Sequence, residues 1–177
     1  DLQGERFTTV LFPPVKGTLS SEFDYESKHY GVDIAMPENS PVHSISEGII
    51  VFAEWTSETG FVIIIEHLNG LISIYKHNAS IIKSQGDRID TGEIIAFTGN
   101  TGSLTTGPHL HFEIRTYNDV PLNPLNYNYK VEDSIRPEAR KLFAYKEKKG
   151  SLFKKRLKMK KINDSIYETQ LKSVDTI

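Results

Sequence analysis

Short runs of β-branched and aromatic residues, separated by turns that contain glycine, fill the chain as far as about residue 129. Such runs favour β-strands, and we expect strands over residues 42–55, 61–67, 71–77, 89–98 and 109–116. No long apolar pattern of helical period lies between them, which disfavours parallel strands joined by crossover helices. The sequence therefore predicts a mainly β fold built on an antiparallel sheet or sandwich.

The dipeptide Asn69-Gly70 separates two of these runs. An Asn-Gly pair supplies the positive φ values that a tight hairpin turn requires. We therefore expect residues 61–77 to form a β-hairpin.

The size and composition fit one folded domain with an appendage. The chain has 177 residues, of which 38% are hydrophobic and 25% charged, a balance typical of folded globular proteins. Its longest strongly apolar runs, such as residues 61–65, are far shorter than the roughly 18 residues of a membrane-spanning helix. The first residue is Asp1 rather than Met, which predicts a processed product or a piece of a longer protein and leaves a lost leader or anchor open.

Charge divides the chain after residue 129. Residues 1–129 hold 7 Lys and Arg against 16 Asp and Glu, a net charge of −9, whereas residues 130–177 hold 14 against 7, a net charge of +7. We therefore expect a domain over 1–129 and a basic tail over 130–177, with helices over about 137–150 and 152–171. The tail is either a solvated amphipathic appendage that packs weakly on the acidic domain or a docking arm for an anionic surface.

The chain contains no cysteine, which limits its chemistry. Disulfides, thiolate nucleophiles and zinc sites made of cysteine are excluded. Any metal must be held by His, Asp or Glu, and all six histidines lie before residue 130. The histidines are therefore the first candidates for functional residues.

His109 and His111 share one face of a predicted strand. Residues i and i+2 of a strand point to the same side, so the two imidazoles project together while Leu110 and Phe112 face the core. A His-x-His pair on a strand is common in metal sites but also arises by chance. The pair therefore needs further ligands.

His29 and Asp33 offer such ligands, one nitrogen and one oxygen four residues apart. Gly31 between them argues against a helix, and a loop or an extended strand can bring the two side chains together. With one histidine of the His-x-His pair they make a set of two nitrogens and one oxygen, which suits zinc and leaves a fourth position for water. That is the arrangement of a catalytic metal site.

A further histidine, His77, ends a predicted strand, and strand alternation places Tyr75 on its face and Lys76 on the opposite face. His77 is therefore a candidate acid or base. His43 lies in an alternating strand and His67 borders the Asn-Gly turn, so both are expected to be structural histidines held by hydrogen bonds.

Three separated motifs occur along the chain. They are His29-x-x-x-Asp33, then Tyr75-x-His77, then Gly99-Asn-Thr-Gly102 followed by Thr106-Gly-Pro-His-Leu-His111. In this order they resemble the M23 family of zinc metallopeptidases, the lysostaphin-like or LytM-type enzymes, over about residues 12–127. The resemblance implies one zinc ion per chain, bound by His29, Asp33 and His111. It also implies that His77 and His109 are the catalytic histidines.

The resemblance further implies a twisted antiparallel sheet crossed by an open groove, and an activity. Substrates in the family are peptide bonds in the stems or bridges of bacterial peptidoglycan, so the protein is expected to act in the cell envelope, in the periplasm or outside the cell. Zinc with this ligand set would lower the pKa of its water toward roughly 7 and polarise the scissile carbonyl. His77 and His109 would handle the proton and the oxyanion, in roles that the sequence does not divide between them.

Two positions depart from the family pattern, since Lys76 stands where a small residue is usual and Asn78 replaces a common leucine. Both are expected to flank the groove face, which would affect specificity more than activity. Residues 15–31 and 104–108 look more like members that cut D-Ala–diaminopimelate cross-links than like the glycine-bridge cutters.

Other functions are weaker. A catalytically inactive M23-like domain that binds and regulates another cell-wall hydrolase is the main alternative, although such members usually lack zinc ligands. Residues 86–99 also resemble strands of biotinyl and lipoyl carrier domains, but the only Met-Lys pair, Met159-Lys160, lies away from any hairpin. Nucleic-acid binding is not expected, because the domain beside the basic tail is acidic. The tail could instead meet anionic envelope polymers or a membrane surface.

Overall fold

A computed structural model describes residues 10–130, and the predicted tail helices lie outside them. The described chain is mainly β, as predicted, with twelve strands and a single-turn 3-10 helix η1 (Pro124–Asn126). Within these residues, no helix is long and apolar enough to cross a membrane. The strands are β1 (Val10–Leu11), β2 (Thr18–Ser21), β3 (Val32–Ala35), β4 (Pro41–His43), β5 (Gly48–Thr56), β6 (Gly60–His67), β7 (Leu71–Ile81), β8 (Arg88–Ile89), β9 (Ile94–Thr98), β10 (His109–Thr116), β11 (Pro121–Leu122) and β12 (Asn128–Tyr129).

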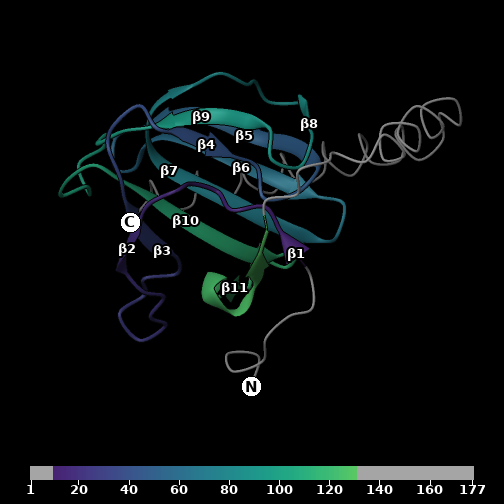
Figure 1. The fold of residues 1–177 in the computed structure, drawn as a ribbon, viewed down its shortest axis with the longest axis horizontal. Coiled ribbons are helices and arrows are strands. Elements are labelled where there is room, and N and C mark those ends of the chain that lie inside the picture. Colours follow the sequence, from purple (N-terminus) through teal and green to yellow (C-terminus); the bar gives the residue numbers. More distant parts are fainter. Residues whose placement is uncertain (1–9, 131–177) are drawn as a thin grey trace, which may run out of the picture. The chain divides into compact units, whose positions relative to one another are not determined.

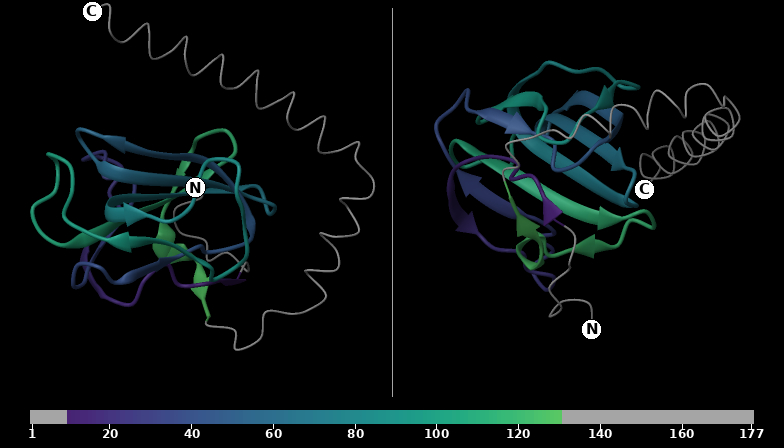
Figure 2. Two further views of the ribbon diagram at one scale, coloured as in Figure 1. Left: turned by 90° about the horizontal axis from the view of Figure 1, so that it is seen from above. Right: turned by 45° about the vertical axis from the view of Figure 1, so that its right-hand side comes forward.

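Ten of these strands form one antiparallel sheet. Its main path runs β2-β3-β10-β7-β6-β5-β8, while β11 pairs with β10, and β9 pairs with both β4 and β7. Figure 1 shows β10 beside β7, and the two views of Figure 2 show the strong twist of the long strands. The remaining strands, β1 and β12, pair with each other in parallel. The antiparallel sheet predicted from the sequence is therefore confirmed.

The predicted hairpin over residues 61–77 is formed by β6 and β7. Its turn is closed by the Gly70 amide, which donates to the His67 carbonyl at 3.1 Å. Gly70 has a φ of 84°, whereas Asn69 keeps a negative φ and accepts a hydrogen bond from the Leu71 amide through its side chain. The two residues thus contribute differently, glycine through its left-handed backbone and asparagine through its amide oxygen.

Two predicted strands are each divided in the structure. The run 42–55 becomes β4 and β5, because the chain turns at residues 44–47 to bury Ile45 completely. The run 89–98 becomes β8 and β9, separated by a turn in which Gly92 has a φ of 75°. Both predictions relied on an unbroken apolar pattern. A buried apolar residue in a turn keeps that pattern unbroken although the strand has ended.

The core lies against one face of the sheet. Phe112 of β10 faces Tyr75 of β7, which in turn faces Ile63 of β6, and all three side chains are almost fully buried. Val42 and Ile95, from β4 and β9, belong to the same apolar cluster. Because successive side chains on a strand alternate, the neighbouring residues of β10 are directed to the opposite face.

Candidate active site

Three adjacent strands place the candidate residues on the face of the sheet opposite the main core. On β10, the partner of His111 is Asp33 on β3 to one side and Lys76 on β7 to the other. Leu110 and Phe112 between and beyond the histidines are buried in the core, as predicted. His29 reaches the same place from the segment before β3, where it forms an isolated bridge with Asp24.

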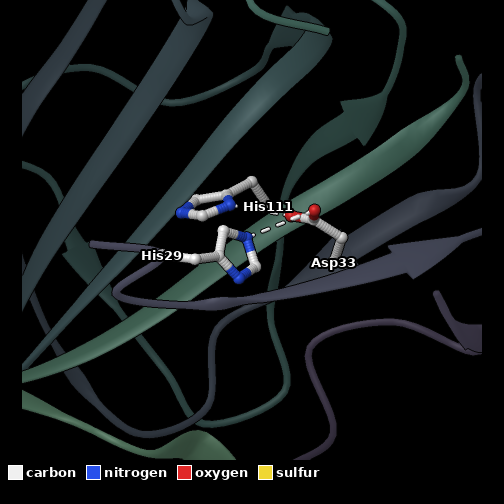
Figure 3. Close-up of side chains that lie close together, drawn as sticks. All are labelled: His29, Asp33 and His111. Carbon is white, nitrogen blue, oxygen red and sulfur yellow. Dashed lines mark hydrogen bonds and ion pairs between the residues drawn. The ribbon is translucent and has the colours of Figure 1, made fainter. Parts of the chain in front are cut away.

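His29, Asp33 and His111 come together as predicted, with one potential ligand atom of each lying within 4.8 Å of the others. His111 Nδ1 lies 2.7 Å from Asp33 Oδ1, and His29 Nε2 lies 3.2 Å from Asp33 Oδ2. Figure 3 shows the two imidazoles and the carboxylate converging on one point. The three residues therefore form a set of two nitrogens and one oxygen.

The chemistry of His29 supports a metal at this point. Its Nδ1 donates to the Glu22 carbonyl at 2.6 Å, so in the neutral imidazole Nε2 carries a lone pair. That Nε2 is buried without a hydrogen-bond partner, although it lies 3.2 Å from a carboxylate oxygen of Asp33. A cation bound between these two acceptors would satisfy both of them. The donor set and the orphaned nitrogen thus fit zinc.

The charges around Asp33 favour its ionised form. Burial opposes ionisation, but the hydrogen bond from His111 and the nearby imidazoles outweigh it and lower the pKa of Asp33 below its ordinary value. Burial also disfavours the charged form of His111, yet its hydrogen bonds to Asp33 and Glu113 raise the pKa of that imidazole. The contact between His111 and Asp33 therefore favours the charged form of both side chains.

His77 and His109 lie beside this cluster with their rings 4.9 Å apart. His77 Nδ1 donates to the Thr101 carbonyl at 2.8 Å, and His109 Nδ1 donates to the Gly107 carbonyl at the same distance. In both neutral rings Nε2 therefore carries the lone pair, and that of His109 lies 3.8 Å from Asp33 Oδ1. Burial lowers the pKa of His77, which favours its neutral form.

The backbone at His77 departs from a regular strand. Its φ is 64°, in the left-handed region that residues with a side chain rarely occupy. Alternation along β7 therefore fails here, and the prediction that Tyr75 shares the face of His77 is wrong. Tyr75 is buried beside Phe112, whereas Lys76 pairs with His111 on the site face. The expectation that Lys76 merely flanks that face is also wrong.

Asn78 and Thr101 hold the distorted backbone around His77. Asn78 is fully buried, and its amide donates to the Phe61 and Tyr75 carbonyls, each at 3.0 Å. The Thr101 hydroxyl donates to the Asn78 carbonyl at 2.6 Å, on the residue next to His77. Asn78, expected to flank the groove face, is thus an interior residue. The sequence did not reveal the role of Thr101, because it contacts His77 through a backbone carbonyl.

Glu113 is a second residue that the motifs did not single out. Its carboxylate is almost fully buried and contacts His111 Nε2 at 3.1 Å, the Lys76 ammonium, and Arg115, whose Nε and Nη2 donate at 2.8 and 2.6 Å. Burial alone would raise its pKa, but these partners lower it to about 2. The i+2 rule that joined His109 to His111 also puts Glu113 on this face, and could have found it.

The other two histidines are hydrogen bonded away from the cluster, as expected. His43 Nδ1 lies 2.9 Å from the Gly92 carbonyl and its ring is tilted against Phe12. His67 is buried between the Glu47 carbonyl and the Ser73 hydroxyl. Both positions are structural.

Comparison with known proteins places the chain in a family. The sequence profile of Peptidase family M23 matches residues 27–124. The DD-carboxypeptidase/endopeptidase Mpg of Neisseria meningitidis serogroup B is 32% identical over 148 residues, which cover 79% of this chain and 34% of the relative. The murein hydrolase activator EnvC of Escherichia coli is 34% identical over 108 residues, which cover 59% of this chain and 26% of the relative.

Among solved structures, Csd3 of Helicobacter pylori superposes with a TM-score of 0.60 at 34% identity, over 82% of this chain and 41% of the other. The chain spans about a third of the length of curated relatives such as Mpg, of which it covers 34%. The matched segment, residues 27–124, includes all five candidate residues: His29, Asp33, His77, His109 and His111. Because that match extends over more than half of the chain, the protein belongs to peptidase family M23.

Proposed function

We propose that this protein is a zinc-dependent endopeptidase that hydrolyses peptide bonds in the stem peptides or cross-links of peptidoglycan. One observation carries the proposal: His29, Asp33 and His111 converge within 4.8 Å, with His77 and His109 beside them. Held by the first three residues, a zinc ion would act as a Lewis acid that makes water nucleophilic near neutral pH and polarises the scissile carbonyl.

The two remaining histidines supply the proton chemistry in this proposal. The Thr101 and Gly107 carbonyls fix the Nδ1–H of each ring, so that each Nε2 is free to accept a proton. Once protonated, the same Nε2 can donate to a leaving amine or to a developing oxyanion. His77, whose pKa is lowered by burial, is suited to the general base, and His109 to the oxyanion and the leaving group.

The substrate and location in this proposal follow from the family and its named relatives. Mpg is named for DD-carboxypeptidase and endopeptidase action, which supports a D-amino-acid cross-link such as D-Ala–diaminopimelate as the bond cleaved. Peptidoglycan lies outside the cytoplasm, so the protein would act in the bacterial envelope, in the periplasm or outside the cell. The basic residues from 130 onward would attract the protein to anionic polymers of the envelope.

A regulatory function without catalysis is the second candidate, supported by the similarity to the murein hydrolase activator EnvC. The two functions differ in what they require of the site. An activator needs neither the metal nor the two proton-transferring histidines, whereas here all five residues are present and oriented. Incubation with purified cell-wall fragments of defined cross-link chemistry, followed by mass spectrometry, separates them: an endopeptidase releases the peptides of one bond type, and an activator releases none by itself.

Zinc binding is the first test. Metal analysis of the purified chain should find close to one zinc ion per chain, and Asp33→Ala should lower it sharply because one of the three ligands is lost. His43→Gln, which alters a histidine outside the cluster, is the matched control and should keep the metal. Full zinc occupancy in a chain lacking all three of His29, Asp33 and His111 would overturn the assignment.

Separation of binding from chemistry is the second test. His77→Ala and His109→Ala should each retain zinc but lose at least roughly two orders of magnitude in turnover, the usual effect of removing a positioned acid or base. The measurement is cleavage of a soluble cross-linked peptide together with metal content. If either variant cleaves at the wild-type rate, the substituted histidine takes no part in the mechanism.

A further inference from the structure

Glu113 is a buried carboxylate that contacts three basic side chains, those of Lys76, His111 and Arg115. Its side chain is only 2% exposed, yet both of its oxygens are occupied. Oε1 contacts His111 Nε2 at 3.1 Å and the Lys76 ammonium, while Oε2 accepts from Arg115 Nε and Nη2. Burying a carboxylate is costly unless every acceptor site is satisfied, so this one is held in a fixed place.

The contact with Glu113 decides which nitrogen of His111 can bind a metal. A neutral imidazole that donates Nε2–H to a carboxylate carries its lone pair on Nδ1, so zinc would replace the proton that Nδ1 donates to Asp33 in the metal-free site. Nδ1 of His111 is the atom that faces Asp33 Oδ1, at 2.7 Å. The acceptor on one side of the ring therefore orients the ligand atom on the other.

The Glu113 side chain and its partner Arg115 also lie beside the segment that carries the other two candidate ligands. Arg115, which grips Glu113, lies over the ring of Tyr30 at 5.9 Å and donates to Asp119 at 2.8 Å. A Cβ atom on Gly31 would come within 2.8 Å of His111 Nε2 and 2.9 Å of Glu113 Cγ. The ligand-bearing segment 29–33 thus packs directly on the Glu113–His111 contact.

We propose that Glu113, anchored by Arg115, is the positioning residue of the metal centre, which fixes His111 with Nδ1 as its ligand atom and aligns the 29–33 segment beside it. This inference rests on the proposed zinc site. Outer-shell carboxylates that accept from a ligating histidine orient the ring and raise its basicity, and their loss typically weakens metal binding by roughly 10- to 100-fold.

Zinc affinity of the full chain tests this proposal, measured by competition with a chromophoric chelator in wild type, Glu113→Gln and Glu113→Ala. The glutamine can still accept from Nε2–H but carries no charge, so its affinity should fall by roughly 10-fold, and that of alanine by up to roughly 100-fold. Glu54→Gln, an exposed glutamate on β5, is the matched control and should bind as wild type does.

Two further measurements separate positioning from stability. The visible spectrum of the cobalt-substituted protein should change in Glu113→Gln, because the ligand geometry changes, and Arg115→Met should weaken zinc binding in the same direction with Glu113 intact. Wild-type zinc affinity and an unchanged cobalt spectrum in folded Glu113→Gln would overturn the inference while leaving the proposed function in place. Failure of the wild-type chain to bind zinc would overturn both.

Discussion

A single glycine allows the segment that carries His29 and Asp33 to approach β10. Gly31 lies between His29 and Asp33, and a Cβ atom at this position would come 2.6 Å from the Phe112 carbonyl as well as against His111. Contacts this short are not tolerated by packed side chains or backbone. The absence of a side chain is thus what lets His29 and Asp33, on one segment, meet His111 on the neighbouring strand.

Gly31→Ala should therefore weaken zinc binding and lower the free energy of unfolding by about 1–3 kcal/mol, since the segment must move away from β10. Chelator competition and urea denaturation measure the two effects. Gly107→Ala is the control, because a Cβ there would meet no atom within 4 Å. Equal behaviour of the two alanine variants would show that the segment adapts without moving its ligands.

At this scale the sequence revealed the residues whose side chains follow simple geometry. His109 and His111 were predicted together because β10 is a regular strand, and alternation holds along it. His77 was predicted as a candidate, but the sheet faces of its neighbours Tyr75 and Lys76 were predicted wrongly. The φ of 64° at His77 is set by tertiary contacts rather than by the residue's own preference. Backbone contacts such as that of the Thr101 carbonyl have no side-chain signature at all.

A buried chain of polar groups links three elements beneath the hairpin. His67 at the end of β6 bonds to the Glu47 carbonyl before β5 and, at 2.7 Å, to Ser73 on β7. Ser73 lies 3.0 Å from the Tyr75 hydroxyl, which accepts from the Ile45 amide at 3.1 Å. Burial raises the pKa of Tyr75 to about 12, so the phenol stays neutral. Buried polar groups satisfied in this way fix how the elements pack.

His67, the histidine of this hydrogen-bonded group, predicts a pH dependence of stability. Burial lowers the pKa of His67 to about 4 from 6.5. As pH falls below about 6.5 the unfolded chain binds a proton that the folded chain refuses, so the free energy of unfolding falls by at most about 1.4 kcal/mol per pH unit until about pH 4. The contribution is complete above pH 6.5 and is lost toward pH 4.

His67→Gln should remove this dependence. Urea denaturation at pH 7 and pH 4.5, with a chelator present, should show the advantage of wild type over the variant shrinking by about 2–3 kcal/mol at the lower pH. His43→Gln serves as the comparison, since His43 is only partly buried. Parallel stability curves for wild type and His67→Gln would contradict a neutral, buried His67.

Element types were predictable, whereas several element boundaries were not. The hairpin of β6 and β7 was marked by two apolar runs around a glycine turn, which is a local signal. The breaks between β4 and β5 and between β8 and β9 depend on where Ile45 and Gly92 meet the rest of the core, which is not local information. The pairing of β3 with β10 joins residues 78 positions apart, as for Asp33 and His111, and only the family pattern pointed to it.

Over the whole molecule, charge is distributed in opposite senses along the sequence. Residues 1–129 carry 16 Asp and Glu against 7 Lys and Arg, and the rest carries 7 against 14. The fold described here closes at β12, where the Lys130 amide donates to the Leu11 carbonyl at 2.8 Å. The residues that form the candidate site all come before this point in the chain.

A chain ending at Lys130 should therefore fold, bind zinc and cleave soluble peptides as the full chain does. On intact sacculi it should be less active than the full chain at low salt, and the difference should shrink at high salt. Salt screens the long-range attraction of the basic segment, with a Debye length of about 8 Å at physiological ionic strength. A chain ending at Asn126 is the control and should unfold, since it loses β12 and the buried Tyr127. Equal losses on soluble and insoluble substrates would show that residues after 130 are structural.

The parallel pairing of β1 with β12 has a consequence for how this domain can be combined with others. Val10 lies beside Asn128, so the start of β1 and the residue that follows β12, Lys130, are roughly 8 Å apart by strand geometry. Domains with adjacent ends can be spliced into a single surface loop of a host protein without separating its two sides. Residues 10–130 have this geometry, and they could sit as an insert within a larger chain as readily as at either end of one.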